Sequence, residues 1–97
     1  MTKKSLELMI REAGNTEIPA LIVLRDKGYD LWIEPDENKK WIDWRAEKEC
    51  RQFSATSPNI LLGLVSMQEW RGDEWQLKAS EPDLYDELLS KAYPDEG

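Results

Sequence analysis

Between Pro19 and Ala55 the chain alternates apolar and polar side chains with a period of two, in short runs separated by turn-forming residues. Such alternation is typical of strands that bury one face, because successive side chains of a strand point to opposite faces of the sheet. Four runs can be distinguished, and the third extends to about Lys48. The pattern therefore predicts a four-stranded antiparallel meander.

The three connections between these runs fix a strand register. Asp26, Lys27 and Gly28 suit a three-residue hairpin, residues 35–40 form a polar loop, and Glu49 with Cys50 suits a two-residue turn. The predicted cross-strand pairs are Val23 with Leu31, Leu21 with Ile33, Glu34 with Trp41, Ile33 with Ile42, Leu31 with Trp44, Ala46 with Phe53, and Trp44 with Ala55.

In this register all four strands agree on which face of the sheet is apolar, whereas a slip of one residue would reverse every side chain. The predicted core face carries Leu21, Val23, Tyr29, Leu31, Ile33, Ile42, Trp44, Ala46, Phe53 and Ala55. The opposite face is mixed and carries Ile22, Leu24, Asp30, Trp32, Glu34, Trp41, Asp43, Arg45, Glu47, Gln52 and Ser54, with Trp32 and Trp41 as diagonal neighbours.

Three amphipathic helices are predicted outside the strands. The first runs from about Lys3 to Ala13, the second is capped by Ser57 with Pro58 at its first position and stops at Gly72, and the third begins at Ser80 with Asp83 in a capping box and is ended by Pro94. Gly63 lies inside the second helix, where glycine is unfavourable, so we expect it to mark a close approach to the sheet.

These elements predict a single α+β domain covering residues 1–97. Its order is α-β-β-β-β-α-α, with a four-stranded antiparallel meander and all three helices packed on the core face. A chain of 97 residues is long enough for one modest core.

The segment from Trp41 to Trp75 contains a capped helix with the residues SPNILLGL, from Ser57 to Leu64, and the ending EWRGD, from Glu69 to Asp73. This segment resembles a pattern found in small uncharacterised bacterial α+β proteins. The resemblance covers about a third of the chain and implies no activity.

The composition removes several kinds of chemistry. The chain has no histidine, so it lacks an imidazole base and a nitrogen ligand for zinc, and its five glycines form neither a phosphate loop nor a dinucleotide-binding fingerprint. We therefore expect no cofactor and no metal site.

The longest apolar run, residues 18–24, is far too short to span a bilayer, and the start of the chain lacks the apolar core of an export signal. A single cysteine, Cys50, suits a reducing compartment, and the expected location is the cytoplasm.

One pair of carboxylates deserves consideration as a catalytic site. Glu34 and Asp43 could approach each other beside the two indoles, in the manner of the acid pair of a glycosidase. An open sheet face offers no cleft in which to tune either acid, however, so the sequence favours a protein that is not an enzyme.

The charge is concentrated at one end of the chain. Residues 69–97 contain nine acidic and three basic residues, which gives this segment a net charge of −6 out of −7 for the whole chain. Direct contact with nucleic acid is opposed by this charge, because phosphate binding needs a basic stripe. An acidic helix and tail instead suit a basic groove on another protein, as in inhibitors and immunity proteins.

We therefore expect a small acidic interaction protein that binds and neutralises a basic protein partner. The residues expected at its binding surface are Trp32, Trp41, Glu34, Asp43, Asp73, Glu74, Asp83, Asp86 and Glu87.

Three alternatives remain for the aromatic face. Trp32 and Trp41 could bind a small molecule or a carbohydrate, or they could form the interface of a homodimer. The loop from Gly72 to Ala79, bringing Trp75 with it, or one of the helices could instead fold over that face as a second small core.

Overall fold

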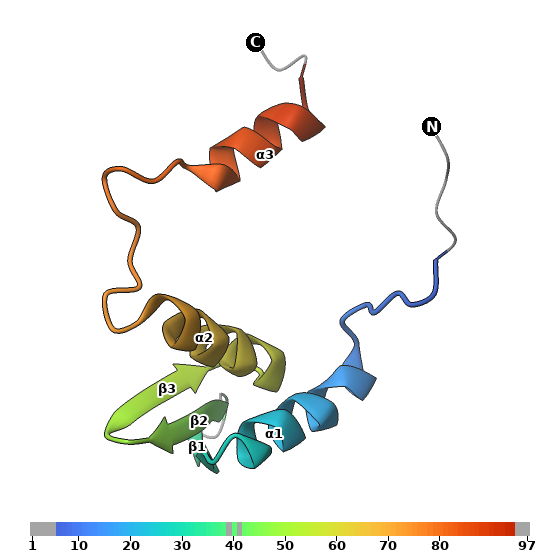
Figure 1. The fold of residues 1–97 in the computed structure, drawn as a ribbon. Coiled ribbons are helices and arrows are strands. Elements are labelled where there is room, and N and C mark those ends of the chain that lie inside the picture. The colour runs from blue at the N-terminus through green and yellow to red at the C-terminus, as the bar shows by residue number, and fades with distance from the viewer. Residues whose placement is uncertain (1–5, 39, 41, 95–97) are drawn as a thin grey trace.

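The computed structural model describes residues 6–38, 40 and 42–94 and has the α+β architecture that the sequence predicts (Figure 1). A three-stranded antiparallel sheet has the strand order β1-β2-β3, and helices α1 and α2 pack on one of its faces. In chain order the elements are the 3-10 turn η1 (Gly14–Thr16), α1 (Glu17–Asp26), β1 (Asp30–Pro35), β2 (Ile42–Lys48), β3 (Arg51–Ala55), α2 (Pro58–Arg71) and α3 (Leu84–Ala92).

The predicted first strand is wrong, because residues 17–26 form helix α1. Gly28 is not the bulge of a hairpin but the left-handed residue just past the helix, with a φ of 97°. Its N–H donates to the Arg25 carbonyl at 2.9 Å, and the N–H of Tyr29 donates to the Leu24 carbonyl at 3.1 Å. These two bonds are those of a Schellman motif, which ends a helix and directs the chain into β1. Pro19 is tolerated in the first turn of α1, where backbone N–H groups have no helical partner.

The predicted helix over residues 3–13 is also wrong for the part that the structure describes. Residues 6–12 have no helical structure, and Leu6, Leu8, Met9 and Ile10 are all exposed. Residues 3–5 of that prediction lie outside the described residues. The reason is a general one: an isolated helix of this length is marginal in water unless its apolar face packs on something.

The predicted pairing of β1 with β2 differs from the observed pairing by two residues. Ile33 pairs with Trp44 and not with Ile42, and Leu31 pairs with Ala46. A shift of two keeps every side chain on its predicted face. The observed register brings Lys48 to the end of α1, where its ammonium donates to the Lys27 carbonyl at 2.7 Å and lies 5.4 Å from the centre of the Tyr29 ring.

The predicted turn between β2 and β3 is confirmed. Ala46 pairs with Phe53 and Trp44 pairs with Ala55, and the two turn residues Glu49 and Cys50 both have positive φ, at 53° and 65°. Two consecutive positive φ angles are the geometry of a type I′ hairpin turn.

Helix α2 has the predicted boundaries. The Ser57 hydroxyl accepts from the Ile60 N–H at 3.2 Å, Pro58 is the first helical residue, and Gly72 ends the helix with a φ of 87°. The prediction for Gly63 is wrong, because a Cβ at that position would have no heavy atom within 4 Å, outside its own helix and chain neighbours. Gly63 therefore lies on the outer side of α2, away from the sheet.

Helix α3 does not pack on the sheet, which corrects the prediction of three helices on one face. It stands apart from the other elements at the end of the segment 72–83 (Figure 1), and it is capped by the Asp83 side chain rather than beginning at Ser80. The Cα radius of gyration is 17.5 Å. A compact chain of this length would have a radius of about 13 Å.

The core lies between the sheet and the two helices that cover it. It consists of Leu24, Tyr29, Ala46, Ala55, Leu61 and Val65, with Leu31, Trp44, Phe53, Leu62 and Leu64 packed against it. Two residues predicted on the core face, Ile33 and Ile42, are about half exposed because the helices do not extend over that end of the sheet. Among the described residues, each helix is too short or too polar to cross a lipid bilayer.

Candidate partner-binding surfaces

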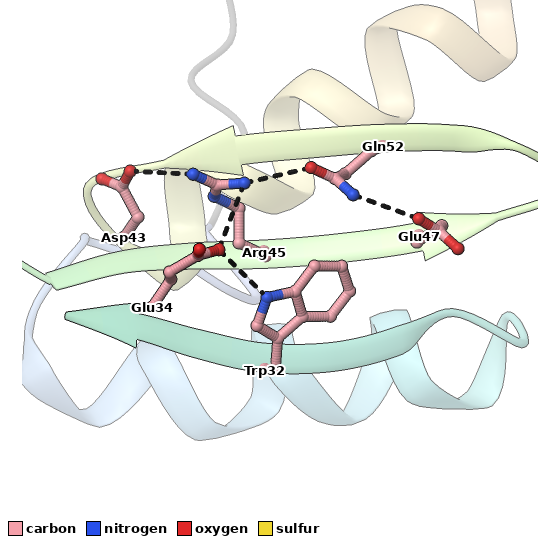
Figure 2. A network of polar contacts seen from close by, with 6 residues as sticks. All are labelled: Trp32, Glu34, Asp43, Arg45, Glu47 and Gln52. Carbon is pink, nitrogen blue, oxygen red and sulfur yellow. Dashed lines mark hydrogen bonds and ion pairs between the residues drawn. The ribbon is translucent and has the colours of Figure 1, made fainter. Parts of the chain in front are cut away.

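The open face of the sheet, opposite α1 and α2, carries a network of polar side chains around Arg45 (Figure 2). The Arg45 guanidinium lies 3.4 Å from a carboxylate oxygen of Glu34 and 3.4 Å from one of Asp43. It also donates to the Gln52 side chain at 3.0 Å. Arg45 therefore ties β1, β2 and β3 together on this face.

The reason for this network is the register of the sheet. Glu34 and Asp43 are direct cross-strand partners, and like charges placed opposite each other destabilise a sheet unless a counter-charge lies between them. Arg45 supplies that charge and is more buried than either acid, with 23% of its side chain exposed. Its Nε atom is buried without a hydrogen-bond partner. The sequence prediction missed the role of Arg45 because it paired Glu34 with Trp41.

The predicted approach of Glu34 and Asp43 is thus observed, but both side chains face water, with 54% and 43% of their surfaces exposed. Trp32 is 36% exposed and its indole N–H donates to Glu34 at 3.3 Å. Trp41, the other predicted aromatic residue, lies outside the described residues.

Asp73 is held on the helix side of the sheet. Arg51 and Asp73 form two parallel hydrogen bonds of 2.7 Å each, and the Gln68 side chain donates to the same carboxylate at 2.7 Å. The bonds from Arg51 and then Gln68 lower the pKa of Asp73 to about 2. Arg51 and Gln52 are consecutive residues of β3, so their side chains point to opposite faces of the sheet. Gln52 contacts Arg45 on the open face, and Asp73, which binds Arg51, therefore lies on the other face.

A second ion pair fixes the chain just after α2. Arg71, in the last turn of α2, donates to the carboxylate of Glu81 at 2.5 Å and to the carbonyls of Trp75 and Gln76 at 2.7 and 3.3 Å. The Lys78 N–H donates to the same carboxylate at 2.9 Å. The bond from Arg71 and then the backbone bond from Lys78 lower the pKa of Glu81 to about 2.

The same segment holds Trp75 beside α2. An open hollow of about 320 Å³ is lined by residues from α2 and from the following loop: Met67, Arg71, Trp75, Leu77, Glu81, Pro82 and Leu84. Trp75 therefore does not cover the open face of the sheet, and the alternative in which residues 72–79 fold over that face is wrong. Glu74 is exposed in this loop.

A third charged cluster connects the ends of α1 and α2. The Glu69 carboxylate accepts from the Lys27 ammonium at 2.7 Å and from the Tyr29 hydroxyl at 3.0 Å. The bond from Lys27 lowers the pKa of Glu69, while burial and the bond to Glu69 raise the pKa of Tyr29 to about 12. Glu69 is thus part of the packing of the domain.

Helix α3 combines an acidic side with an apolar side. Asp83 caps the helix by accepting from the Asp86 N–H at 3.0 Å, and Asp86 and Glu87 lie in the first turn. Among the described residues, the carboxylates of Asp86 and Glu87 make no ion pair. The apolar side chains Leu84, Tyr85, Leu88 and Leu89 are between 43% and 78% exposed.

The predicted binding residues therefore do not form one surface. Trp32, Glu34 and Asp43 lie together on the open face, Asp73 and Glu74 lie in the segment after α2, and Asp83, Asp86 and Glu87 lie at the start of α3. In the part of the chain that the structure describes, no three acidic or cysteine side chains are close enough to hold a metal ion.

Comparison of the chain with protein-family models, with curated proteins and with solved structures gives no match. The resemblance of residues 41–75 to small bacterial α+β proteins accordingly stays a prediction.

Proposed function

We propose that this protein is a small acidic interaction protein without enzymatic activity, and that it binds and neutralises a basic protein partner through helix α3. The observation that carries the proposal is that α3 exposes its whole apolar side while it stands away from the domain that the other elements form.

The pattern of α3 suits recognition of a helix by a groove. Leu84 and Leu88 are four residues apart, as are Tyr85 and Leu89, so these four side chains form one continuous stripe on the helix. Amphipathic helices that bind in grooves use anchors with this spacing. Asp86 and Glu87 project from the other side of α3, where they would meet a basic rim.

The ion pairs elsewhere in the chain support α3 as the charged surface. Glu34 and Asp43 are paired with Arg45, Asp73 with Arg51, and Glu69 with Lys27. Carboxylates that already have an internal counter-charge contribute less attraction to a partner than unpaired ones. Charges that lie at the rim of an interface mainly accelerate association, and this effect decreases with added salt.

The cytoplasm is the proposed location of this encounter. Cys50 is an exposed free thiol, and a free thiol persists in a reducing compartment.

The proposal is tested by quantitative capture from a lysate of the native cell, at low and at high salt, with the full chain as bait. Two variants remove one property of α3 each: Leu88→Ser with Leu89→Ser removes the apolar anchors, and Asp86→Asn with Glu87→Gln removes the charge. We expect one basic protein to be retained by the unchanged chain and to be lost with the first variant at every salt concentration. With the second variant the amount of partner retained should be reduced mainly at low salt.

The matched control is Asp30→Asn with Glu37→Gln, which removes the same charge from exposed positions of the sheet domain. It should retain the partner as the unchanged chain does. If the control and the charge variant lose the partner equally, the attraction comes from net charge alone and α3 is not the binding element.

A further inference from the structure

The hollow beside α2 presents apolar surface to water at the base of α3. It is formed by the last turns of α2, the loop that follows and the first residue of α3, and its volume is about 320 Å³. Leu77 and Leu84 are 68% and 58% exposed, and Trp75 is 43% exposed. These side chains therefore line the hollow without being buried by the rest of the chain.

Arg71 fixes the walls of the hollow. Its guanidinium binds the Glu81 carboxylate and the carbonyls of Trp75 and Gln76, and the Lys78 N–H donates to the same carboxylate. The loop is thus held in one course before anything binds. A site that is ordered in advance loses less conformational entropy on binding than one that has to be ordered.

The charges in the hollow favour an apolar occupant. Arg71 and Glu81 are its charged residues, and they neutralise each other. A charged side chain that entered would lose water without gaining a counter-charge, which is costly, whereas burial of an apolar side chain is favourable. The Met67 sulfur and the Trp75 indole favour an aromatic ring in particular, because thioethers and aromatic rings make favourable contacts with one.

The size of the hollow suits a single projecting side chain. Pockets that enclose a small molecule have volumes of about 300–1,000 Å³ and bury most of the ligand. This hollow lies at the lower end of that range and is open to solvent. Pockets of this kind in protein interfaces take one anchoring side chain of the partner.

We propose that the hollow binds one aromatic side chain of the basic partner, which projects from the partner's surface beside the groove that holds α3. This inference rests on the proposed function and adds a second contact with the same partner. Leu84 connects the two contacts, because it lines the hollow and also begins the apolar stripe that continues to Leu88. A groove that encloses the stripe therefore reaches the edge of the hollow.

The charge around the hollow determines which surface can deliver the aromatic side chain. Residues 72–87 contain six acidic residues and one basic residue, Lys78. These charges attract an aromatic residue that is flanked by lysine or arginine, and they repel one on an acidic surface. A second copy of this chain, with its net charge of −7, is accordingly opposed as the occupant.

The proposal is tested with two tripeptides as probes, lysine–phenylalanine–lysine and lysine–serine–lysine, both with blocked ends. They carry the same charge, so only the aromatic side chain distinguishes them. In an NMR titration of the full chain, the phenylalanine peptide should shift the signals of the Met67 methyl group and the Trp75 indole N–H, with a dissociation constant on the order of millimolar. The serine peptide should shift neither signal.

Leu77→Ser removes one wall of the hollow at an exposed position, so the domain should stay folded. It should weaken binding of the phenylalanine peptide by about fivefold. The matched control is Leu6→Ser, which changes another exposed leucine, at 82%, and should leave the dissociation constant unchanged. The proposal is overturned if both peptides shift the two signals equally, if neither shifts them at the highest soluble concentration, or if the two variants bind the phenylalanine peptide equally well.

The captured basic partner separates this inference from the proposed function. Leu77→Ser should weaken its binding by about tenfold, and Leu88→Ser with Leu89→Ser should abolish it. If Leu77→Ser binds the partner as tightly as the unchanged chain while the α3 variant does not, the hollow is not a contact and the proposed function stands. If the α3 variant also binds the partner, the proposed function is wrong, and the peptide titration still decides whether the hollow takes an aromatic side chain.

Discussion

Arg71 and Glu81 form an ion pair that fixes the direction in which the chain leaves α2, since the guanidinium binds the carboxylate at 2.5 Å across ten positions of sequence. The same Arg71 guanidinium donates to the backbone carbonyls of Trp75 and Gln76, which lie between Arg71 and Glu81 in the sequence. Helix α3 follows three residues after Glu81, so this pair determines where the proposed binding element is presented.

Loss of this pair should loosen the segment 75–82 without unfolding the domain. Glu81→Gln removes the charge that holds Arg71, and we expect faster amide hydrogen exchange at Lys78, whose N–H donates to Glu81. Amides of the core strand β2 should exchange as before. Glu74→Gln, in the same loop, serves as the control and should change neither region.

The acid range offers a direct test of the Arg71–Glu81 and Arg51–Asp73 ion pairs. The pKa of Glu81 is about 2 in the folded chain against an ordinary 4.5, and that of Asp73 is about 2 against 3.8. A lowered folded pKa means that each pair contributes its full stability above the ordinary value and loses it as the pH falls towards 2. Carboxyl ¹³C titration should therefore give midpoints near pH 2 for both groups. Arg71→Ala should move the Glu81 midpoint towards 4.5 and leave that of Asp73 in place; unchanged midpoints would contradict the observed pairing.

The hairpin turn between β2 and β3 stores backbone strain. Cys50 has a φ of 65°, a left-handed conformation that costs about 1–2 kcal/mol for a residue with a side chain and almost nothing for glycine. Cys50→Gly should therefore stabilise the domain by about 1 kcal/mol, after the entropy that glycine gains on unfolding is subtracted. This corresponds to a rise in the melting temperature of about 4–8 °C. Cys50→Ala removes the thiol but keeps the strain, and its melting temperature should hardly change.

Alanine at two glycines should have opposite effects on stability. Gly28 has a φ of 97° at the end of α1, so Gly28→Ala should destabilise the domain by about 1–2 kcal/mol. Gly63 is helical and has open space around it, so Gly63→Ala should stabilise the monomer by up to about 1 kcal/mol. Urea denaturation at low protein concentration measures both. A change in the free energy of unfolding with the same sign for both substitutions would contradict the positions that the structure gives to these two glycines.

The elements with local signals were predicted well from the sequence. Ser57, Pro58 and Gly72 define α2 because capping depends on residue type at fixed positions, and the alternation of β2 and β3 fixes their register. The binary pattern also identified the open face of the three observed strands, because a register error of two residues preserves the faces. It wrongly placed Ile22 and Leu24 on that face, since both lie in α1 and Leu24 is part of the core.

The errors arose where one local signal has two meanings. The run 17–26 is rich in β-branched residues and is followed by Gly28, which serves equally as a hairpin bulge or as the end of a helix. The long-range contacts of Lys48 with Lys27 and Tyr29 favour the helix, and no pattern in the sequence reports them. The site was predicted in part. Glu34, Asp43 and Asp73 were named, but their partners Arg45 and Arg51 depend on the tertiary fold.

The most direct test of α3 as the binding element is the association rate with the captured basic partner, measured against ionic strength. Neutralisation is confined to Asp86 and Glu87, because Asp83 caps the helix. We predict that Asp86→Asn with Glu87→Gln slows association at low salt, that the difference disappears at high salt, and that Asp30→Asn with Glu37→Gln has a smaller effect throughout. Equal association rates for the unchanged chain and the α3 variant at low salt would contradict the account.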